Sequence, residues 1–307
     1  MNDTCRLVTR SDFDGLMCAV LLNELHLIDD IVFAEPGDLQ QGLIQLTDRD
    51  ITCDLPFMPE VHLAFDHHAS ELTRVKQCAD NHVIIPLAPS TARVVYDYYG
   101  GAHTFPHISE YLMEAVDAID SARLSREEIL HPSGYILLGF LCDPRTGLYL
   151  FKDFATSHIA FLMKLIETMG RQDISNILEI PMVKERASLY YEHAKPFNHL
   201  IKRCTSVHGN VVVFDPRGEN DLYIGNRFVI YALYPGCNVS ITLTQRHDGF
   251  TSLSVGKSIL DHSSSAKIGD ILLAFNGGGH DNAGSCRVEN GLVDSVLREL
   301  ISIFKAA

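Results

Sequence analysis

The sequence has little positive charge, no closely spaced pair of cysteines and no long apolar run. It contains 25 Lys and Arg against 39 Asp and Glu. Its formal net charge of −14 excludes a non-specific DNA coat or a basic membrane anchor, because it repels anionic backbones and lipids. Its eight cysteines include no C-x-x-C pair, so the sequence indicates neither a zinc ribbon nor a disulfide framework, and we expect reduced, mostly buried thiols. The cysteines are Cys5, Cys18, Cys53, Cys78, Cys142, Cys204, Cys237 and Cys286.

Signals for export or membrane insertion are also lacking. The first residues, Met-Asn-Asp-Thr-Cys-Arg, do not have the basic stretch and apolar core of a signal peptide. The longest apolar runs, at 16–22 and 135–142, are far shorter than the ~20 residues that span a bilayer. We therefore expect a soluble, cytoplasmic protein with no membrane partner.

The apolar pattern changes its period along the chain. The 307 residues have a globular composition, and their number corresponds to about two domains of ~150 residues. Up to residue 150, short apolar runs alternate with helical patterns, which predicts parallel βαβ units. From 154 to 200 the period is helical, and after 200 it changes to two before a final amphipathic helix. The predicted strands are at 7–9, 31–34, 51–53, 62–65 and 83–85, and then at 211–214, 228–233, 239–243 and 251–255.

This pattern predicts an α/β fold in three parts. We expect a domain with a doubly wound, mostly parallel sheet at 1–150 and a helical connector at 151–200. A smaller α/β domain with a mixed sheet is expected at 201–307.

Acidic and imidazole side chains follow three of the predicted strands. Parallel strands end at one edge of a sheet, where such folds place ligands, so these side chains are expected to lie together. Crowded carboxylates repel and raise one another's pKa, and a hard divalent cation relieves this. Mixed carboxylate and imidazole ligands suit Mn²⁺, with Mg²⁺ and Co²⁺ as alternatives. The residues are Asp12 and Asp14 after the first strand, Asp54 after the third, and Asp66, His67 and His68 after the fourth.

Each of these motifs alone has a simpler interpretation. Asp-x-Asp-Gly also fits a turn or a helix cap, Asp54 also fits a loop, and one histidine also fits a buried polar residue of the core. Their position at the ends of three strands favours a metal site.

The same motifs carry a family resemblance. Ser11-Asp12-Phe13-Asp14-Gly15, Asp54 and Asp66-His67-His68 resemble the first three motifs of the DHH phosphoesterase superfamily. Residues 276–284, Asn-Gly-Gly-Gly-His-Asp-Asn-Ala-Gly, resemble the G-G-G-H-x-x-A-G signature of the DHH-associated C-terminal domain. The motifs occur in the family's order and at matching distances, and the two halves cover nearly the whole chain.

The resemblance implies a metal-dependent hydrolase of phosphoric esters, with two metal positions in the first domain. Two aspartates offer the fourth-motif ligand, and Asp120 is favoured over Asp117 because a small residue follows it. Asp54 and this fourth Asp would bridge the two positions. Asp66 would orient an imidazole and His68 would face the scissile phosphate. The implied metal ligands are Asp12, Asp14, Asp54, His67 and Asp120.

The first motif departs from the family's His-x-Asp-x-Asp, because Arg10 stands in the place of the metal-binding His. A guanidinium is always protonated, so it cannot donate a lone pair to a metal, and its charge repels a dication. We therefore expect one tightly bound ion, at the second position, rather than two. Arg10 is expected to pair with Asp12 or to clamp a substrate phosphate. The alternative is that Arg10 points away and a first metal is still bound.

For the C-terminal domain the resemblance implies substrate binding. The glycine turn would let backbone N–H groups approach an anion or a base, and His280 would add a hydrogen bond to phosphate. Lys257 would pair with a phosphate, although an exposed lysine is more often a plain surface charge. The implied substrate-binding residues are Ser254, Lys257, Gly277, Gly278, Gly279 and His280.

These observations predict a phosphodiesterase for linear dinucleotides of the pGpG type or very short oligoribonucleotides. An acidic chain lacks the basic groove that long nucleic acid requires, so no long duplex partner is expected. The alternatives are an exopolyphosphatase or phosphomonoesterase, and a nucleotide-binding regulator without turnover. The sequence leaves open the base preference, linear against cyclic substrates, and monomer against homodimer.

Overall fold

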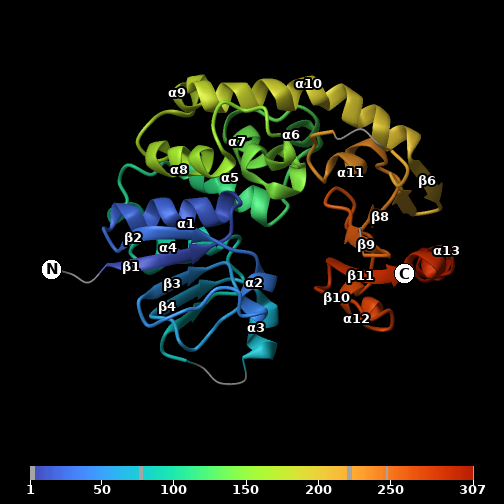
Figure 1. Cartoon of the computed structure of the whole chain (residues 1–307), viewed down its shortest axis with the longest axis horizontal. Helices are drawn as coiled ribbons and strands as arrows, with labels where there is room; N and C mark the ends of the chain where they lie inside the picture. The colour runs from blue at the N-terminus through green and yellow to red at the C-terminus, as the bar shows by residue number, and fades with distance from the viewer. Residues whose placement is uncertain (1–3, 76–78, 220–222, 247, 307) are drawn as a thin grey trace. The chain divides into compact units, whose positions relative to one another are not determined.

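In the computed structural model, the short apolar runs between residues 5 and 84 form a five-stranded sheet in which every pairing is parallel (Figure 1). The strand order is β2-β1-β3-β4-β5. Leu7 and Val8 of β1 are fully buried, as in a strand that is covered on both faces. The strands are β1 (Cys5–Thr9), β2 (Ile28–Phe33), β3 (Asp50–Cys53), β4 (Leu63–Asp66) and β5 (His82–Ile84). The structure describes residues 4–75, 79–219, 223–246 and 248–306.

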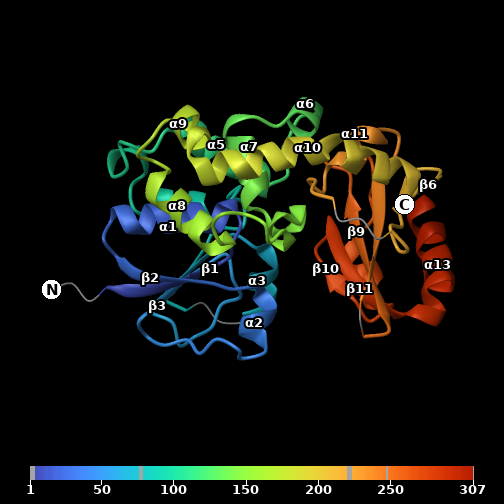
Figure 2. The ribbon, with the colours of Figure 1, turned by 45° about the horizontal axis from the view of Figure 1, so that its top comes forward.

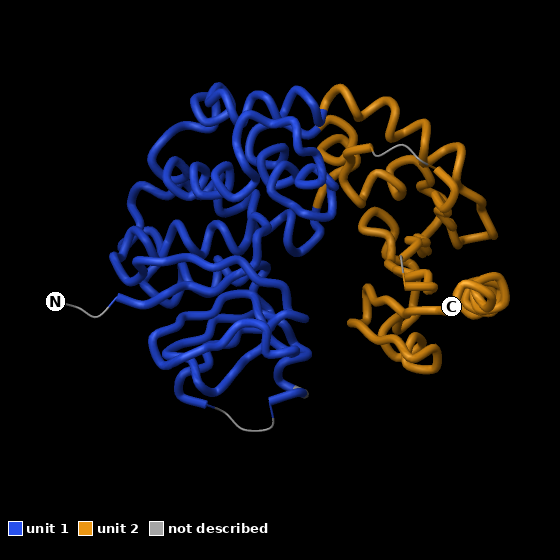
Figure 3. The backbone as a smooth tube through the Cα atoms, viewed as in Figure 1, with its two compact units in different colours: residues 1–123, 132–190 blue, residues 124–131, 191–307 orange. Residues whose placement is uncertain are grey.

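The chain divides into two compact units (Figure 3). Unit 1 comprises Met1–Arg123 and Pro132–Tyr190, and unit 2 comprises Leu124–His131 and Tyr191–Ala307. The chain passes from one unit to the other within the long helix α10 (Pro181–Arg203). Among the described residues, no helix combines the length and the apolar character that crossing a membrane requires.

The helices of unit 1 begin at polar residues that cap them. Asp12 accepts a hydrogen bond from the backbone N–H of Gly15, at 3.2 Å, and so caps α1. Ser90 caps α4 and Ser109 caps α5 in the same way. The helices are α1 (Phe13–Glu24), α2 (Pro36–Gln40), α3 (Ala69–Arg74), α4 (Thr91–Tyr98), α5 (Glu110–Asp120), α7 (Gly134–Cys142), α8 (His158–Thr168) and α9 (Ile174–Glu179). Single 3₁₀ turns are η1 (Gly101–His103), η2 (Pro144–Thr146) and η3 (Leu148–Leu150).

Unit 2 contains a six-stranded mixed sheet in the order β10-β11-β9-β8-β7-β6. The pairing of β7 with β8 is parallel, and the other pairings are antiparallel. The strands are β6 (Thr205–His208), β7 (Val211–Phe214), β8 (Val239–Gln245), β9 (Phe250–Lys257), β10 (Gly278–Gly279) and β11 (Ala283–Glu289). The helices are α6 (Arg126–Leu130), α11 (Val229–Leu233), α12 (Ile268–Leu273) and α13 (Val293–Lys305), with a 3₁₀ turn at η4 (Asn290–Leu292).

One face of this sheet is the core of unit 2. Leu253 and Val255 of β9 alternate with Ser252 and Ser254, so the aliphatic side chains point inward and the hydroxyls point outward. The C-terminal helix α13 lies along the sheet (Figure 2) and packs Leu300 and Phe304 into the same core. On β9 the outward face is therefore small and polar.

The predicted α/β fold, with a parallel sheet followed by a mixed sheet, is confirmed. The strand predicted at 228–233 is wrong, because Val229–Leu233 forms the helix α11. Residues 229 to 232 are all buried, and a short helix without a polar face gives the same unbroken apolar run as a buried strand. The seven described cysteines are free thiols, and all but Cys204 are buried, as expected; Cys78 lies outside the described residues.

Candidate metal centre

Five carboxylates and two imidazoles meet beyond the carboxyl ends of β1, β3 and β4. The ligand atoms of Asp54, His67 and His68 lie within 4.8 Å of one another. Those of Asp14, His67 and Asp120 also lie within 4.8 Å of one another. Asp120 comes from the last turn of α5, so one helix completes a cluster that the strands begin. The buried carboxylates are Asp12, Asp14, Asp54 and Asp66.

The Asp14 carboxylate is held by the first turn of α4. Its Oδ2 accepts the backbone N–H of Thr91 at 2.9 Å and its Oδ1 accepts that of Ala92 at 2.7 Å. Helix N-termini stabilise anions in this way. Burial nevertheless raises the pKa of Asp14 well above its usual value, and the charges of Asp120 and Asp54 raise it further. A cation bound at this carboxylate would relieve the repulsion.

Asp54 has an unusual backbone as well as a buried side chain. Its φ of 58° lies in the left-handed region, which Asp and Asn tolerate better than most residues. Its backbone N–H still donates to the carbonyl of Phe65, at 3.2 Å, so β3 stays paired with β4 at this point. Burial, together with the charges of Asp12 and Asp120, raises the pKa of Asp54 to about 7.

His67 presents one ring nitrogen to the carboxylates. Its Nδ1 lies 3.0 Å from the carbonyl oxygen of Ala88, so in the neutral ring the proton is on Nδ1 and the lone pair is on Nε2. Nε2 lies 3.1 Å from Oδ2 of Asp120, but without the alignment of a hydrogen bond. Burial lowers the pKa of His67, but Asp120 and Asp14 reverse this and raise it to about 10.

His68 is oriented by Asp66. Oδ1 of Asp66 accepts His68 Nδ1 at 2.7 Å, and it also accepts the backbone N–H groups of His67 and His68, at 2.8 and 3.2 Å. Burial lowers the pKa of His68, but the hydrogen bond that it donates to Asp66 and the charge of Asp54 raise it above its usual value. The imidazole is therefore fixed in direction and biased toward its cationic form.

The two aspartates that the sequence offered for the fourth motif lie in different surroundings. Asp117 uses both carboxylate oxygens to fasten α5 to α4: Oδ1 accepts Ser90 Oγ at 2.7 Å, and Oδ2 accepts Nε and Nη2 of Arg93 at 2.9 and 2.7 Å. Asp120 instead faces His67 and Asp14. These contacts favour Asp120 as the metal ligand.

The glycine turn of unit 2 is shaped mainly by its own backbone. A Cβ at Gly277 would lie 2.4 Å from the carbonyl oxygen of Ser285. At Gly279, a Cβ would lie 2.3 Å from that of Ala283. A Cβ at Gly278 would meet nothing within 4 Å. Packing therefore requires two of the three glycines, and only Gly278 faces open space.

The other predicted binding residues lie near this turn. Ser254 is exposed on β9, where it pairs with Ser285 of β11, which in turn pairs with Gly278 of β10. His280 is exposed at the end of β10, and Lys257 is half-buried at the end of β9. Sequence reasoning missed Ser285, although the alternation of β11 would have placed it on the outward face.

Comparison with known proteins bears on this arrangement. No protein-family model matches the sequence, and neither does any curated protein. The structure is similar to the pGpG-specific phosphodiesterase PggH from Vibrio cholerae, with 45% sequence identity, a TM-score of 0.84 and coverage of 99% of both chains. The chain belongs to the DHH phosphoesterase superfamily.

RecJ from Thermus thermophilus shares the fold. Its structures in complex with Mg²⁺ and with Mn²⁺ have 14% and 12% identity to this chain, each with a TM-score of 0.51. They cover 98% of this chain and about half of RecJ, 50% and 52% respectively.

In this DHH phosphoesterase, Arg10 points into the acidic cluster. Its Nη1 donates to Asp54 Oδ2 at 3.3 Å, its Nη2 lies 3.2 Å from Asp12 Oδ2, and its Nε lies 3.9 Å from Glu35 Oε2. Burial lowers the pKa of Arg10, but these carboxylates raise it further above its usual value. The expectation that Arg10 pairs with Asp12 is confirmed, and the alternative that it points away is wrong.

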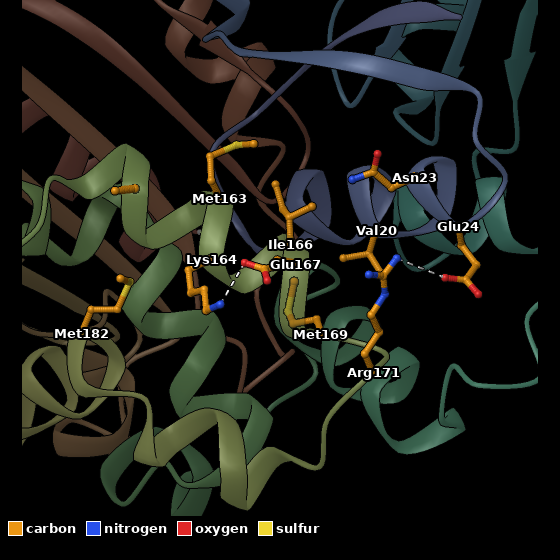
Figure 4. A pocket seen from close by; sticks show the side chains of 11 residues that line it. Val20, Asn23, Glu24, Met163, Lys164, Ile166, Glu167, Met169, Arg171 and Met182 are labelled. Atoms are coloured by element: carbon orange, nitrogen blue, oxygen red, sulfur yellow. Dashed lines mark hydrogen bonds and ion pairs between the residues drawn. The ribbon is translucent and has the colours of Figure 1, made fainter.

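A separate hollow of about 530 Å³ in unit 1 contains none of the candidate site residues of this DHH phosphoesterase (Figure 4). Met163, Met169 and Met182 line it. Its charged residues are tied in ion pairs, Lys164 with Glu167 at 2.9 Å and Arg171 with Glu24 at 4.0 Å. We assign it no part in the reaction.

Proposed function

We propose that this chain is a metal-dependent phosphodiesterase that hydrolyses linear dinucleotides of the pGpG type, or very short oligoribonucleotides, to mononucleotides. The observation that carries the proposal is the similarity to a pGpG-specific phosphodiesterase over 99% of both chains, at 45% identity. The buried acidic cluster supports it, since divalent cations held by such carboxylates activate water and neutralise the scissile phosphate in metal-dependent phosphodiesterases. The formal net charge of −14 favours a short substrate over a long strand.

Several atoms of the cluster fit a divalent cation. Asp12 Oδ2, Asp54 Oδ1 and His67 Nε2 are buried and make no hydrogen bond within the described part of the chain. Buried polar atoms are costly without a partner, and carboxylate and imidazole donors suit Mn²⁺, with Mg²⁺ and Co²⁺ as alternatives. The chemistry that such a cation supplies when bound is activation of water and neutralisation of charge on the phosphate oxygens. The residues that would hold it are Asp14, Asp54, His67 and Asp120.

Arg10 is the reason to propose one tightly bound ion rather than two. Its guanidinium lies between Asp12 and Asp54, where it supplies the positive charge that a second ion would otherwise bring. A fixed cation there offsets the acidic cluster without an open coordination position.

His68 acts on the scissile phosphate in this proposal. Asp66 holds Nδ1, so the other ring nitrogen is directed by a rigid support. A cationic imidazole donates a hydrogen bond to a phosphate oxygen and stabilises the charge that develops there.

Catalysis and substrate binding are assigned to different parts of the chain. We assign the chemistry to residues 1–150 and the binding of nucleotide to residues 201–307, with 151–200 as a helical connector. In unit 2 the open face of Gly278 and the exposed hydroxyl of Ser254 suit contact with a nucleotide, and His280 and Lys257 add polar groups. Gly277 and Gly279 shape the turn. The free, mostly buried thiols suit a reducing compartment, so we propose the cytoplasm.

A substrate panel tests the proposal. The purified chain is incubated with Mn²⁺ and, in separate reactions, with pGpG, a cyclic dinucleotide, a 3′-phosphorylated mononucleotide or polyphosphate. The products are separated by chromatography. Mononucleotides from pGpG support the proposal. Orthophosphate from polyphosphate, without dinucleotide cleavage, would instead indicate the exopolyphosphatase, and binding of dinucleotide without turnover would indicate a regulator.

A further inference from the structure

Arg145 lies on the loop that follows α7, and none of the family motifs includes it. α7 packs against Phe13, the residue between Asp12 and Asp14, so closely that a Cβ at Gly139 would lie 2.9 Å from Phe13 Cδ1. One helical turn after Gly139, α7 ends and η2 begins. A Cβ at Gly139 would also meet Ile119, the residue before Asp120, so α7 packs on both segments that carry aspartates of the cluster, and Arg145 follows this helix within unit 1.

The loop holds Arg145 firmly. Oδ1 of the buried Asp143 accepts both the backbone N–H of Arg145, at 2.8 Å, and its Nε, at 2.7 Å. The hydroxyl of Thr146 donates to the carbonyl of Asp143 at 2.8 Å, which closes the turn. The guanidinium is thereby fixed at one edge, and its two terminal nitrogens make no hydrogen bond to the described residues.

Arg145 and Arg10 differ in what remains available to a ligand. Arg10 is only 17% exposed, and both of its terminal nitrogens face carboxylates. The side chain of Arg145 is 40% exposed. Burial and the charge of Arg10 lower the pKa of Arg145, but the carboxylates of Asp143 and Asp12 outweigh them and raise it above its usual value. Arg10 is thus an internal counter-charge, and Arg145 is the guanidinium that can still bind an anion.

The charges of the substrate indicate which anion this is. A 5′-phosphorylated dinucleotide carries one negative charge on its diester and about −1.5 to −2 on its terminal phosphate at neutral pH. The diester is the group that is cleaved, so it belongs at the buried cluster. The terminal phosphate is the more highly charged group, and an acidic chain repels it unless a cation receives it. A guanidinium with two free terminal nitrogens suits such a phosphate, because it binds two oxygens at once.

We propose that Arg145 binds the terminal 5′-phosphate of the dinucleotide and makes the enzyme selective for 5′-phosphorylated substrates. This inference rests on the proposed phosphodiesterase function and names the group that the same site selects. It assigns to Arg145 the phosphate-clamping role that was one of two expectations for Arg10.

The test compares pGpG with GpG, which lacks the terminal phosphate. In the wild type we expect a higher kcat/KM for pGpG. Arg145→Gln should lower kcat/KM for pGpG by about 10- to 100-fold, mainly through KM, because charge-assisted hydrogen bonds are lost. The same variant should leave GpG unchanged, so the preference disappears. Arg145→Lys, which keeps the charge but not the fork, should lie between the two. Arg171→Gln is the matched control, since Arg171 is 63% exposed and pairs with Glu24, and it should alter neither substrate.

An equal loss on both dinucleotides, or no loss on either, would overturn the inference. Binding of the two dinucleotides measured by titration calorimetry gives the same comparison without turnover. A wild type that cleaves neither dinucleotide would contradict the proposed function, and the calorimetric difference between pGpG and GpG would still test Arg145 by itself.

Discussion

Asp54 combines a left-handed backbone, with a φ of 58°, with a carboxylate that has no exposed surface. A strained backbone persists only where the surrounding contacts hold it in place, and such positions are concentrated at functional sites. Burial and the charges of Asp12 and Asp120 raise the pKa of Asp54 to about 7, so its ionised form is disfavoured unless a cation is bound. Asp54 is therefore the residue whose substitution separates function from stability most cleanly.

We expect Asp54→Asn to abolish hydrolysis while the protein stays folded, because Asn keeps the left-handed conformation but loses the metal-binding charge. In the metal-free protein the variant should unfold at the same temperature as the wild type or higher, since a buried, repelled carboxylate is removed. Asp54→Ala is the control: it should lose activity equally but also about 1–2 kcal/mol of stability, from the left-handed backbone. Thermal unfolding and turnover measured on both variants decide this, and a folded, active Asp54→Asn would refute the metal assignment.

Arg10 yields a prediction about metal stoichiometry. Because its guanidinium pairs with both Asp12 and Asp54, we expect one Mn²⁺ per chain in the wild type and two in Arg10→His, where an imidazole replaces the positive charge. Elemental analysis after equilibration with saturating Mn²⁺ gives the count. Two tightly bound ions in the wild type would show that Arg10 does not occupy the first position.

At the scale of elements, the turn before β11 separates packing from binding. Gly277→Ala should destabilise unit 2 by about 1–3 kcal/mol, because the added Cβ would press against the backbone of Ser285 at 2.4 Å. Gly278→Ala should leave the unfolding temperature near that of the wild type, since its Cβ meets nothing within 4 Å, but it should raise KM several-fold. A Gly278→Ala variant with unchanged KM would remove this turn from the substrate-binding surface.

His158, in the first turn of α8, is expected to lower the stability of the folded chain at acidic pH. Burial, with the charges of Arg186 and Lys152, lowers the pKa of His158 from 6.5 to about 4, and its Nε2 has no hydrogen bond among the described residues. Between these values the unfolded chain binds a proton that the folded chain does not, so stability is complete above pH 6.5 and is lost as the pH falls toward 4.

The free energy of unfolding, measured by urea titration, should decline less steeply between pH 6.5 and 4 in His158→Gln than in the wild type. At the acid end the difference should be at most about 3 kcal/mol. At pH 8 the variant should differ little from the wild type. A parallel decline in both proteins would locate the acid sensitivity elsewhere in the chain.

Element types were predictable where the pattern was long and periodic. The strands around Leu7, Ile51 and Phe65 and the amphipathic helix α13 follow from apolar periodicity. The helix α11 did not, because it is short and buried on every side. The strands β10 and β11 were missed because glycines and small polar residues dominate them, and their packing depends on close backbone approach rather than on apolar side chains.

At the scale of the whole molecule, the cluster could be predicted because parallel strands end at one edge of a sheet. The residues that support it could not. The backbone carbonyl of Ala88, which fixes the His67 ring, has no sequence signature, and neither has the packing of α7 on Phe13. The segment 124–131 belongs to unit 2, where the side chain of Asn226 donates to the carbonyl of Ile129 at 3.0 Å. No local sequence pattern predicts that contact.

The central claim is that this acidic chain cleaves short nucleotides with a divalent cation in its buried cluster. The most direct measurement is the conversion of pGpG by the full-length chain, first stripped of metal with a chelator and then supplied with Mn²⁺, with the products resolved by chromatography. The account predicts no hydrolysis in chelator and conversion of each pGpG to two molecules of GMP once Mn²⁺ is restored. Hydrolysis that persists in chelator, or a folded, Mn²⁺-loaded chain that leaves pGpG intact, would contradict it.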